Sequence, residues 1–212
     1  MVVTEFEGGR LALRTEPAQR RSALRTERIL TAAGKLIGQH GPDALSTTRL
    51  AKEAGVSVGS IYRYFVDREA IFDAVLQRNL DMLIDRLFEV EFSLAGPDWR
   101  DKIREAVDVN VDFHRNRDSG YVAMWFARSF AGRTNEANRR GDEIVAKHLV
   151  ETLPPERLAR LGRHPEAIVH MAMAIGTKGM ELAFGHDDPT GDQLMIEETK
   201  CAMIAYLEHY FD

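Results

Sequence analysis

Residues 45–72 read LSTTRLAKEAGVSVGSIYRYFVDREAIF, and this stretch decides the fold of the N-terminal part of the chain. It contains two short helical segments, Thr47 to Ala54 and Val58 to about Tyr62, which are joined by a glycine-containing turn. A serine, Ser46 or Ser57, precedes each segment at the position where an N-cap belongs. Two short helices joined in this way are typical of a helix-turn-helix, whose second helix enters the DNA major groove.

The same stretch carries a longer pattern. Its matching residues are Leu50, Ala51, Ala54, Gly55, Val56, Ser57, Gly59, Tyr62, Tyr64, Phe65 and Glu69. This pattern resembles the DNA-binding domain of the tetracycline-repressor (TetR) family, and the resemblance covers about residues 22–75. The departures are mild: Tyr64 stands where His is commoner, Arg68 stands where Lys is commoner, and Ile71 replaces a final Leu. The resemblance implies a homodimeric DNA-binding regulator, most often a repressor, whose body binds a small molecule that releases a palindromic operator.

Charge is distributed unevenly along the chain, whose formal net charge is −5. Between Arg10 and Arg68, Lys and Arg outnumber Asp and Glu by six, whereas from Glu69 to Asp212 acidic residues are in excess by nine. A basic head on an acidic body suggests a polyanionic partner for the head alone. The alternative is that these arginines form an ordinary solvated helix face.

Chemistry and the family pattern together assign roles at DNA. Free amides and hydroxyls at a helix N-terminus suit a phosphate, small residues let a recognition helix approach base edges, and Arg63 is the candidate for a guanine contact. The two tyrosines and Arg68 are expected to contact phosphate. The predicted DNA-binding residues are Ser46, Thr47, Thr48, Ser57, Val58, Gly59, Ser60, Tyr62, Arg63, Tyr64 and Arg68. For Ser46 and Ser57 the alternative is helix capping alone.

The remaining pattern indicates an all-α protein of about nine helices, because amphipathic periods recur and no period-two strand pattern is present. We expect a flexible basic arm over residues 1–21, a helix-turn-helix domain over 22–68, and a ligand-binding and dimerisation domain over 69–212. The arm arginines (Arg14, Arg20, Arg21 and Arg25) could reach an adjacent minor groove, and solvated disorder is the alternative. Residues 156–163 are left open as one turn or a short helix.

A candidate effector pocket follows from the helix that begins near Asp98. Apolar residues with two polar groups among them suit a pocket for a mid-sized, mostly apolar molecule, and methionines make a flexible wall. The predicted pocket residues are Ile103, Val107, Asn110, His114, Met124, Trp125, Phe126, Met171 and Met173. Plain core packing is the alternative for each of them.

Small residues recur at steps of four, three and four in the segment from Pro165 to Phe184, and such a strip lets another helix approach closely. We predict that this strip and one face of the last helix form a four-helix dimer interface. The predicted interface residues are Ala172, Gly176, Gly179, Ala183, Ile196, Met203, Leu207 and Tyr210. The alternative is that the glycines face a neighbour inside the protomer.

Several classes of function lack a pattern in the sequence. The histidines make no metal-ligand pair at a helical step, no nucleophile elbow or phosphate-binding glycine loop is present, and Cys201 is the only cysteine. The longest mainly apolar stretch without a charge, 167–177, is far shorter than the roughly 20 residues that span a bilayer. We therefore expect a cytoplasmic protein without cofactor, metal, membrane association or enzymatic activity. The competing hypotheses are a helical interaction or enzyme-like protein with an unused helix-turn-helix, and a regulator of this type without a small-molecule effector.

Overall fold

The computed structural model of the chain describes residues 20–89, 99–116, 118, 120–127, 131–185 and 190–212. The regular elements in these ranges are ten α-helices and one short 3-10 helix, so the all-α prediction is confirmed. This is one α-helix more than the nine or so expected. The additional helix is α8 (Pro155–Arg160), which lies in the segment expected to be either one turn or a short helix. None of the helices in the described ranges combines the length and the apolar character that a membrane span requires.

The chain divides into two compact units. The first contains α1 (Arg20–His40), the 3-10 helix η1 (Pro42–Ala44), α2 (Thr47–Ala54), α3 (Val58–Tyr64), α4 (Arg68–Glu89) as far as Asn79, and α6 (Tyr121–Phe126). The second contains the rest of α4 together with α5 (Trp99–Arg115), α7 (Ala131–Thr152), α8, α9 (Pro165–Phe184) and α10 (Gln193–Phe211). Most of the expected arm lies outside the described residues, and residues 20 and 21 already belong to α1.

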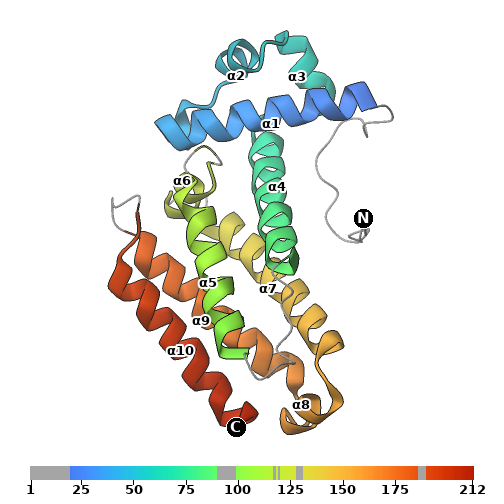
Figure 1. Cartoon of the computed structure of the whole chain (residues 1–212). Helices are drawn as coiled ribbons and strands as arrows, with labels where there is room; N and C mark the ends of the chain where they lie inside the picture. The colour runs from blue at the N-terminus through green and yellow to red at the C-terminus, as the bar shows by residue number, and fades with distance from the viewer. Residues whose placement is uncertain (1–19, 90–98, 117, 119, 128–130, 186–189) are drawn as a thin grey trace. The chain divides into compact units, whose positions relative to one another are not determined.

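The first unit is built on α1, along which α2 and α3 lie (Figure 1). Its core is apolar and fully buried, with Ile29 and Ile37 from α1 and Phe72 and Val75 from α4. The Nη1 of Arg78 on α4 donates to Glu27 and Thr31 of α1, at 3.1 and 3.0 Å. The first half of α4 therefore packs with the helix-turn-helix, and this unit extends beyond the boundary expected after residue 68.

The helix α6 joins the first unit through a close approach to α1. Gly120 precedes α6 with a φ of 72°, and a Cβ added there would lie 2.7 Å from the carbonyl oxygen of Gly34. Only glycine combines that backbone conformation with so little space. A contact between Gln39 and Asp118 reinforces the same junction.

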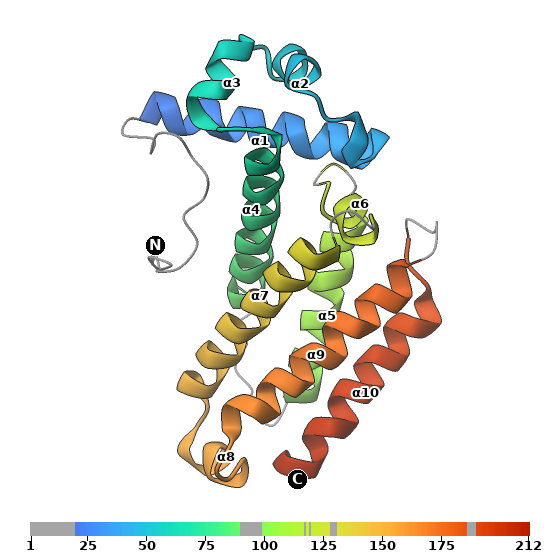
Figure 2. The ribbon, with the colours of Figure 1, turned by 180° about the vertical axis from the view of Figure 1, so that it is seen from behind.

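The second unit is a helical bundle in which α10 packs along α9, α9 along α7, and α5 against α10 (Figures 1 and 2). Lys200 of α10 is largely buried and donates to Asp108 of α5 at 2.7 Å. Trp99 at the start of α5 meets Phe211 at the end of α10 edge to face, with ring centroids 5.2 Å apart. These contacts join α5 to α10, the last helix of the chain.

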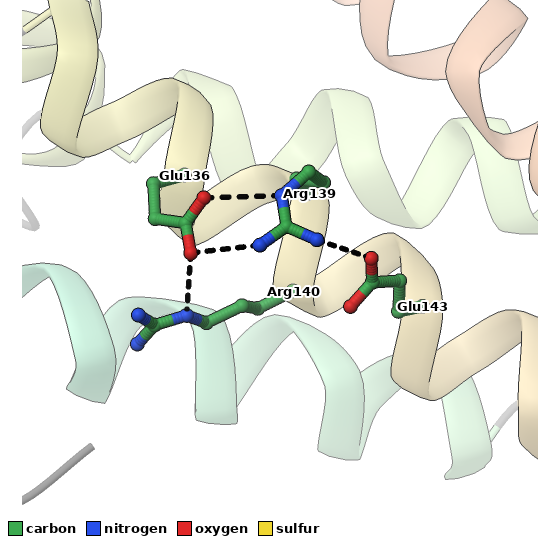
Figure 3. A network of polar contacts seen from close by, with 4 residues as sticks. All are labelled: Glu136, Arg139, Arg140 and Glu143. Atoms are coloured by element: carbon green, nitrogen blue, oxygen red, sulfur yellow. Dashed lines mark hydrogen bonds and ion pairs between the residues drawn. The ribbon is translucent and has the colours of Figure 1, made fainter. Parts of the chain in front are cut away.

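The outward face of α7 carries a network of exposed charges, Glu136, Arg139, Arg140 and Glu143 (Figure 3). Arg139 and Arg140 donate to Glu136 at 2.8 to 3.0 Å, and Arg139 also pairs with Glu143. Exposed ion pairs of this kind stabilise a helix by only a few tenths of a kcal/mol. These exposed charges mark the side of α7 that faces solvent. The other side of the helix therefore packs inward.

Candidate nucleic-acid interface

The local geometry of α2 and α3 confirms the helix-turn-helix that the sequence predicts. Ser46 caps α2 by accepting from the backbone amide of Arg49 at 3.2 Å, and Ser57 caps α3 by accepting from the amide of Ser60 at 3.1 Å. Between them Gly55 ends α2 with φ 63° and ψ 40°, a left-handed conformation that favours glycine. Both serines are therefore capping residues, and a phosphate contact by either one stays a prediction.

The first turn of α3 presents small residues to solvent. Ser57 and Gly59 are exposed, while Val58 and Ser60 are partly covered. Among the described residues beyond its chain neighbours, a Cβ added at Gly59 would meet only the Oγ of Ser57, at 4.0 Å. Since the protein has room for a side chain there, nothing inside the described fold requires glycine at position 59. The requirement, where there is one, comes from what binds this surface.

The two tyrosines of α3 lie in different environments. Tyr62 is 42% exposed and its position suits the expected phosphate contact. Tyr64 is 1% exposed, and its hydroxyl accepts hydrogen bonds from Ser22 and from Arg63, each at 2.9 Å. The expectation of a direct phosphate contact by Tyr64 is therefore not supported by its position, because the hydroxyl is buried between α1 and α3.

Arg68 also differs from expectation. Its Nη2 donates to the carbonyl oxygen of Pro42 at 2.8 Å, and its guanidinium lies over the ring of Phe72, 5.0 Å from the centroid. Asp43 is 3.9 Å away and almost fully exposed. Arg68 thus ties the start of α4 to the 3-10 helix η1 before α2, and a phosphate contact would have to use its remaining donors.

Some cations of the basic head are bound by other residues of the same unit. Arg28 donates to the carbonyl oxygen of Ala54 at the C-terminal end of α2, at 2.9 Å, and Lys35 pairs with Glu53 at 3.0 Å. Two exposed cations on α2 itself, Arg49 and Lys52, are not among the predicted DNA-binding residues. Their signal was available in the sequence, since both belong to the helix-turn-helix. They add positive charge beside the predicted phosphate-binding residues at the start of α2. Ser46 and Thr48 are exposed there, and Thr47 is partly covered.

Comparison with known proteins identifies this architecture. Residues 29–75 match the family described as bacterial regulatory proteins, tetR family, and residues 98–207 match the tetracyclin repressor-like C-terminal domain. The chain belongs to the TetR family. It is therefore a DNA-binding transcriptional regulator.

Individual relatives are similar over most of their length. A crystal structure of a TetR-family transcriptional regulator from Streptomyces coelicolor is 30% identical, with a TM-score of 0.59, and the match covers 90% of this chain and 99% of that one. An uncharacterized HTH-type transcriptional regulator of Mycobacterium tuberculosis is 27% identical over 84% of this chain and 85% of its own. A structure described as the molecular basis for control of antibiotic production by bacterial hormones shares the fold, with a TM-score of 0.64 and 15% identity over 85% of this chain and 96% of that one.

The predicted pocket residues of this TetR-family chain lie in both units. Ile103, Val107 and His114 of α5 are buried in the second unit, where Asn110 and Met173 are partly covered. Met124 and Trp125 are buried in the first unit, and Phe126 beside them is exposed. Met171 is 53% exposed on α9, and this position does not favour the pocket wall expected for it. For the other residues a pocket role stays a prediction.

His114 occupies the most constrained position in this set. Its Nδ1 lies 2.8 Å from the carbonyl oxygen of Asn110, and its ring stacks on Phe184 with centroids 5.1 Å apart. Burial lowers the pKa of His114 to about 4, and the bond to Asn110 opposes this shift only partly. The imidazole is therefore neutral at physiological pH. In the described part of the chain, the Oδ1 of Asn110 is buried without a hydrogen-bond partner.

A polar face on α7 was missed by sequence reasoning. Thr134 and Asn138 are buried, and Asp142 follows one turn later, so three polar residues recur at steps of four on the inward face. Asp142 accepts from the hydroxyl of Thr177 on α9 at 3.2 and 3.3 Å. Burial raises the pKa of Asp142 to about 6. The step of four can be seen in the sequence. An exposed polar helix face has the same spacing, so the sequence alone does not show that these residues are buried.

The small-residue strip on α9 lies inside the protomer, so the dimer interface predicted from it was wrong. A Cβ at Gly179 would lie 2.0 Å from the Oγ1 of Thr199 on α10, and one at Gly176 would lie 3.1 Å from the Sδ of Met203. The rest of the set packs in the same way, since Ala172, Ala183, Ile196, Met203 and Leu207 are buried and only Tyr210 and Gly176 are partly exposed. The glycines allow α9 and α10 of one chain to approach closely, which is the alternative that the sequence left open.

Proposed function

We propose that this TetR-family regulator acts as a homodimeric repressor that is released from a palindromic operator by a small molecule. The observation that carries the DNA side of this proposal is the exposed glycine at position 59. A recognition helix reads base edges with its N-terminal residues. The open first turn of α3 lets the backbone approach the groove, and Arg63 and Tyr62 follow one turn later on exposed positions.

The outer face of α9 and α10 supports the dimer. Among the most exposed apolar residues of the second unit are Met171 and Leu182 on α9 and Leu194 on α10, with exposed fractions of 53%, 50% and 64%. They lie away from the strip that joins the two helices. A second copy of the chain is the occupant that fits, because helix-turn-helix proteins that bind palindromes do so as two-fold dimers. The proposed interface thus uses the two helices that the sequence indicated, but a face of α9 that is separate from the glycine strip.

The effector site is proposed within the second unit. The inward polar face of α7 and the partly covered Asn110 favour a small molecule that is mostly apolar but carries at least one hydrogen-bonding group. A structure of this fold is described in terms of control by bacterial hormones, which favours a regulator that responds to an effector. Coupling of about 1–3 kcal/mol between effector and DNA is enough to release the operator.

Mobility shift with duplex DNA from upstream of the chain's own gene tests the DNA side. Gly59→Asp puts a carboxylate against the groove and is expected to abolish binding. Gly132→Asp is the matched control, since Gly132 is also exposed and a Cβ there meets no described atom within 4 Å. Wild-type affinity in Gly59→Asp would remove α3 from the role of recognition helix. Absence of any shift with wild-type protein would favour a helix-turn-helix that is not used.

Analytical ultracentrifugation tests the dimer. Leu182→Asp is expected to give a folded monomer, because it places a charge in the apolar interface. Met82→Asp alters an exposed apolar residue of α4 in the same unit and is expected to leave the dimer intact.

For the effector, thermal-shift screening of small metabolites against wild type and Asn110→Leu is informative. Equal stabilisation of both by a bound compound would exclude Asn110 from the site.

A further inference from the structure

Tyr64 and Arg63 are adjacent in sequence and form one compact group at the end of α3. The Nη2 of Arg63 donates to the hydroxyl oxygen of Tyr64 at 2.9 Å, and the guanidinium carbon lies 5.0 Å from the centroid of the same ring. The tyrosine is itself fixed, because it is buried and its hydroxyl also accepts from Ser22 on α1 at 2.9 Å. Arg63 is exposed on the recognition helix.

This arrangement restricts a side chain that is otherwise mobile. An arginine side chain has many rotamers to lose when it is ordered, and its donors form a rigid planar fork. One hydrogen bond and one ring face, both provided by a buried residue, fix the plane of that fork before any partner arrives. Reading a guanine through its O6 and N7 atoms requires a fork of defined orientation, and pre-organised side chains bind with a smaller entropic loss.

We propose that Tyr64 is a positioning residue for base readout, whose hydroxyl orients the guanidinium of Arg63 toward a guanine of the operator. The inference rests on the proposed use of α3 as the recognition helix. It assigns to position 64 a part in sequence specificity, in place of the phosphate contact that its burial does not support. A histidine at this position would offer a different geometry to Arg63, so the residue at position 64 would tune which base Arg63 prefers.

The hydrogen bonds at this hydroxyl agree with a shared role. The bond from Ser22 and, secondarily, the bond and charge of Arg63 lower the pKa of Tyr64, against the opposite effect of burial. The two hydrogen bonds at this hydroxyl have different partners, so mutation of Ser22 or of Arg63 can remove one bond and leave the other. The Ser22 bond ties α1 to α3, whereas the Arg63 bond orients a side chain on the exposed surface.

The test is selection of binding sites from a duplex library with a randomised core, carried out with the full-length chain. Arg63→Ala is expected to relax the preference at one base position of each half-site by roughly 10- to 100-fold. Tyr64→Phe keeps the buried ring and removes only the hydroxyl, and is expected to relax the same position by roughly 3- to 10-fold. Ser22→Ala and Tyr121→Phe, a second buried tyrosine of the same unit, are expected to keep the wild-type base preference.

The double variant Arg63→Ala/Tyr64→Phe separates positioning from a general effect on folding. If Tyr64 acts through Arg63, the second change adds no further relaxation, whereas a folding defect lowers affinity for all sequences in either background. The inference is overturned if Tyr64→Phe keeps full preference, if it relaxes a different position, or if Ser22→Ala reproduces its effect. If wild-type protein selects no sequence at all, the proposed use of α3 fails as well.

Discussion

The side chain of Thr199 on α10 occupies the space that a side chain at position 179 on α9 would need. Its Oγ1, Cγ2 and Cβ atoms would lie 2.0, 2.4 and 2.7 Å from a Cβ at that position. The threonine is held there, since its hydroxyl donates to the carbonyl oxygen of Met195 at 2.6 Å. A glycine in the middle of a helix costs roughly 1 kcal/mol relative to alanine, and the close contact of the two helices offsets that cost.

Gly179→Ala is therefore expected to destabilise the protein. Overpacking costs roughly 1–3 kcal/mol, of which the better helix propensity of alanine recovers about 1. Thermal unfolding followed by circular dichroism should show a melting temperature several degrees lower. Gly176→Ala is the matched control: it meets the flexible end of Met203 at 3.1 Å and should be nearly neutral. Thr199→Ala should restore part of the loss in Gly179→Ala, and equal stability of the two glycine variants would contradict this account.

Gly59→Ala should change stability and DNA binding in opposite directions. Because a Cβ at position 59 meets no atom of the described fold closer than 4.0 Å, alanine is expected to stabilise α3 by up to about 1 kcal/mol. The added methyl faces the groove, so operator affinity should fall while the melting temperature rises. Melting curves and mobility shifts on the same preparation measure both effects. A variant that is less stable than wild type would show that glycine is needed by the fold itself.

The helix-turn-helix was predictable because its signals are local. Caps, a left-handed glycine and apolar spacing over a few residues specify α2, the turn and α3 without reference to the rest of the chain. The role of Tyr64 was not predictable in this way. Its hydroxyl is bound by Ser22, 42 residues earlier, and sequence spacing carries no information about such a contact.

The pattern on α9 shows a different limit of sequence reasoning. Steps of four, three and four identified correctly that Gly176 and Gly179 share one face. A strip of small residues fits any closely packed helix, whether it belongs to the same chain or to a partner. Only the position of Thr199 decides between the two, and α10 begins after a segment whose path the sequence does not specify. The exposed face of α9 carries Met171, which the sequence predicts in a pocket wall, and Leu182, for which the sequence predicts no role.

Asp142→Asn is expected to stabilise the protein in a pH-dependent manner. The pKa of Asp142 is raised from 3.8 to about 6, first by burial, with Glu143 adding to the shift and with Thr177 and His170 opposing it. The neutral form is favoured in the folded state, so its contribution to stability is present below pH 3.8 and is lost as the pH rises through 6. Asparagine should thus gain on the order of 2–3 kcal/mol at pH 7 and close to nothing below pH 4. Urea unfolding at both pH values measures the difference, and a gain that does not depend on pH would contradict it.

His114 should impose the opposite pH dependence, because burial lowers its pKa from 6.5 to about 4. Its contribution to stability is complete above pH 6.5 and is lost as the pH falls to about 4, by roughly 3 kcal/mol. In wild type the gain from Asp142 over the same range offsets much of this loss, so the contributions of the two groups should nearly cancel between pH 4 and 6.5. In Asp142→Asn that compensation is absent, and urea unfolding should show stability falling steeply as the pH drops from 6.5 to 4. Adding His114→Gln, which keeps a polar side chain but does not titrate, should make the curve flat again at a lower overall stability. A steep loss that persists in the double variant would assign it to another group.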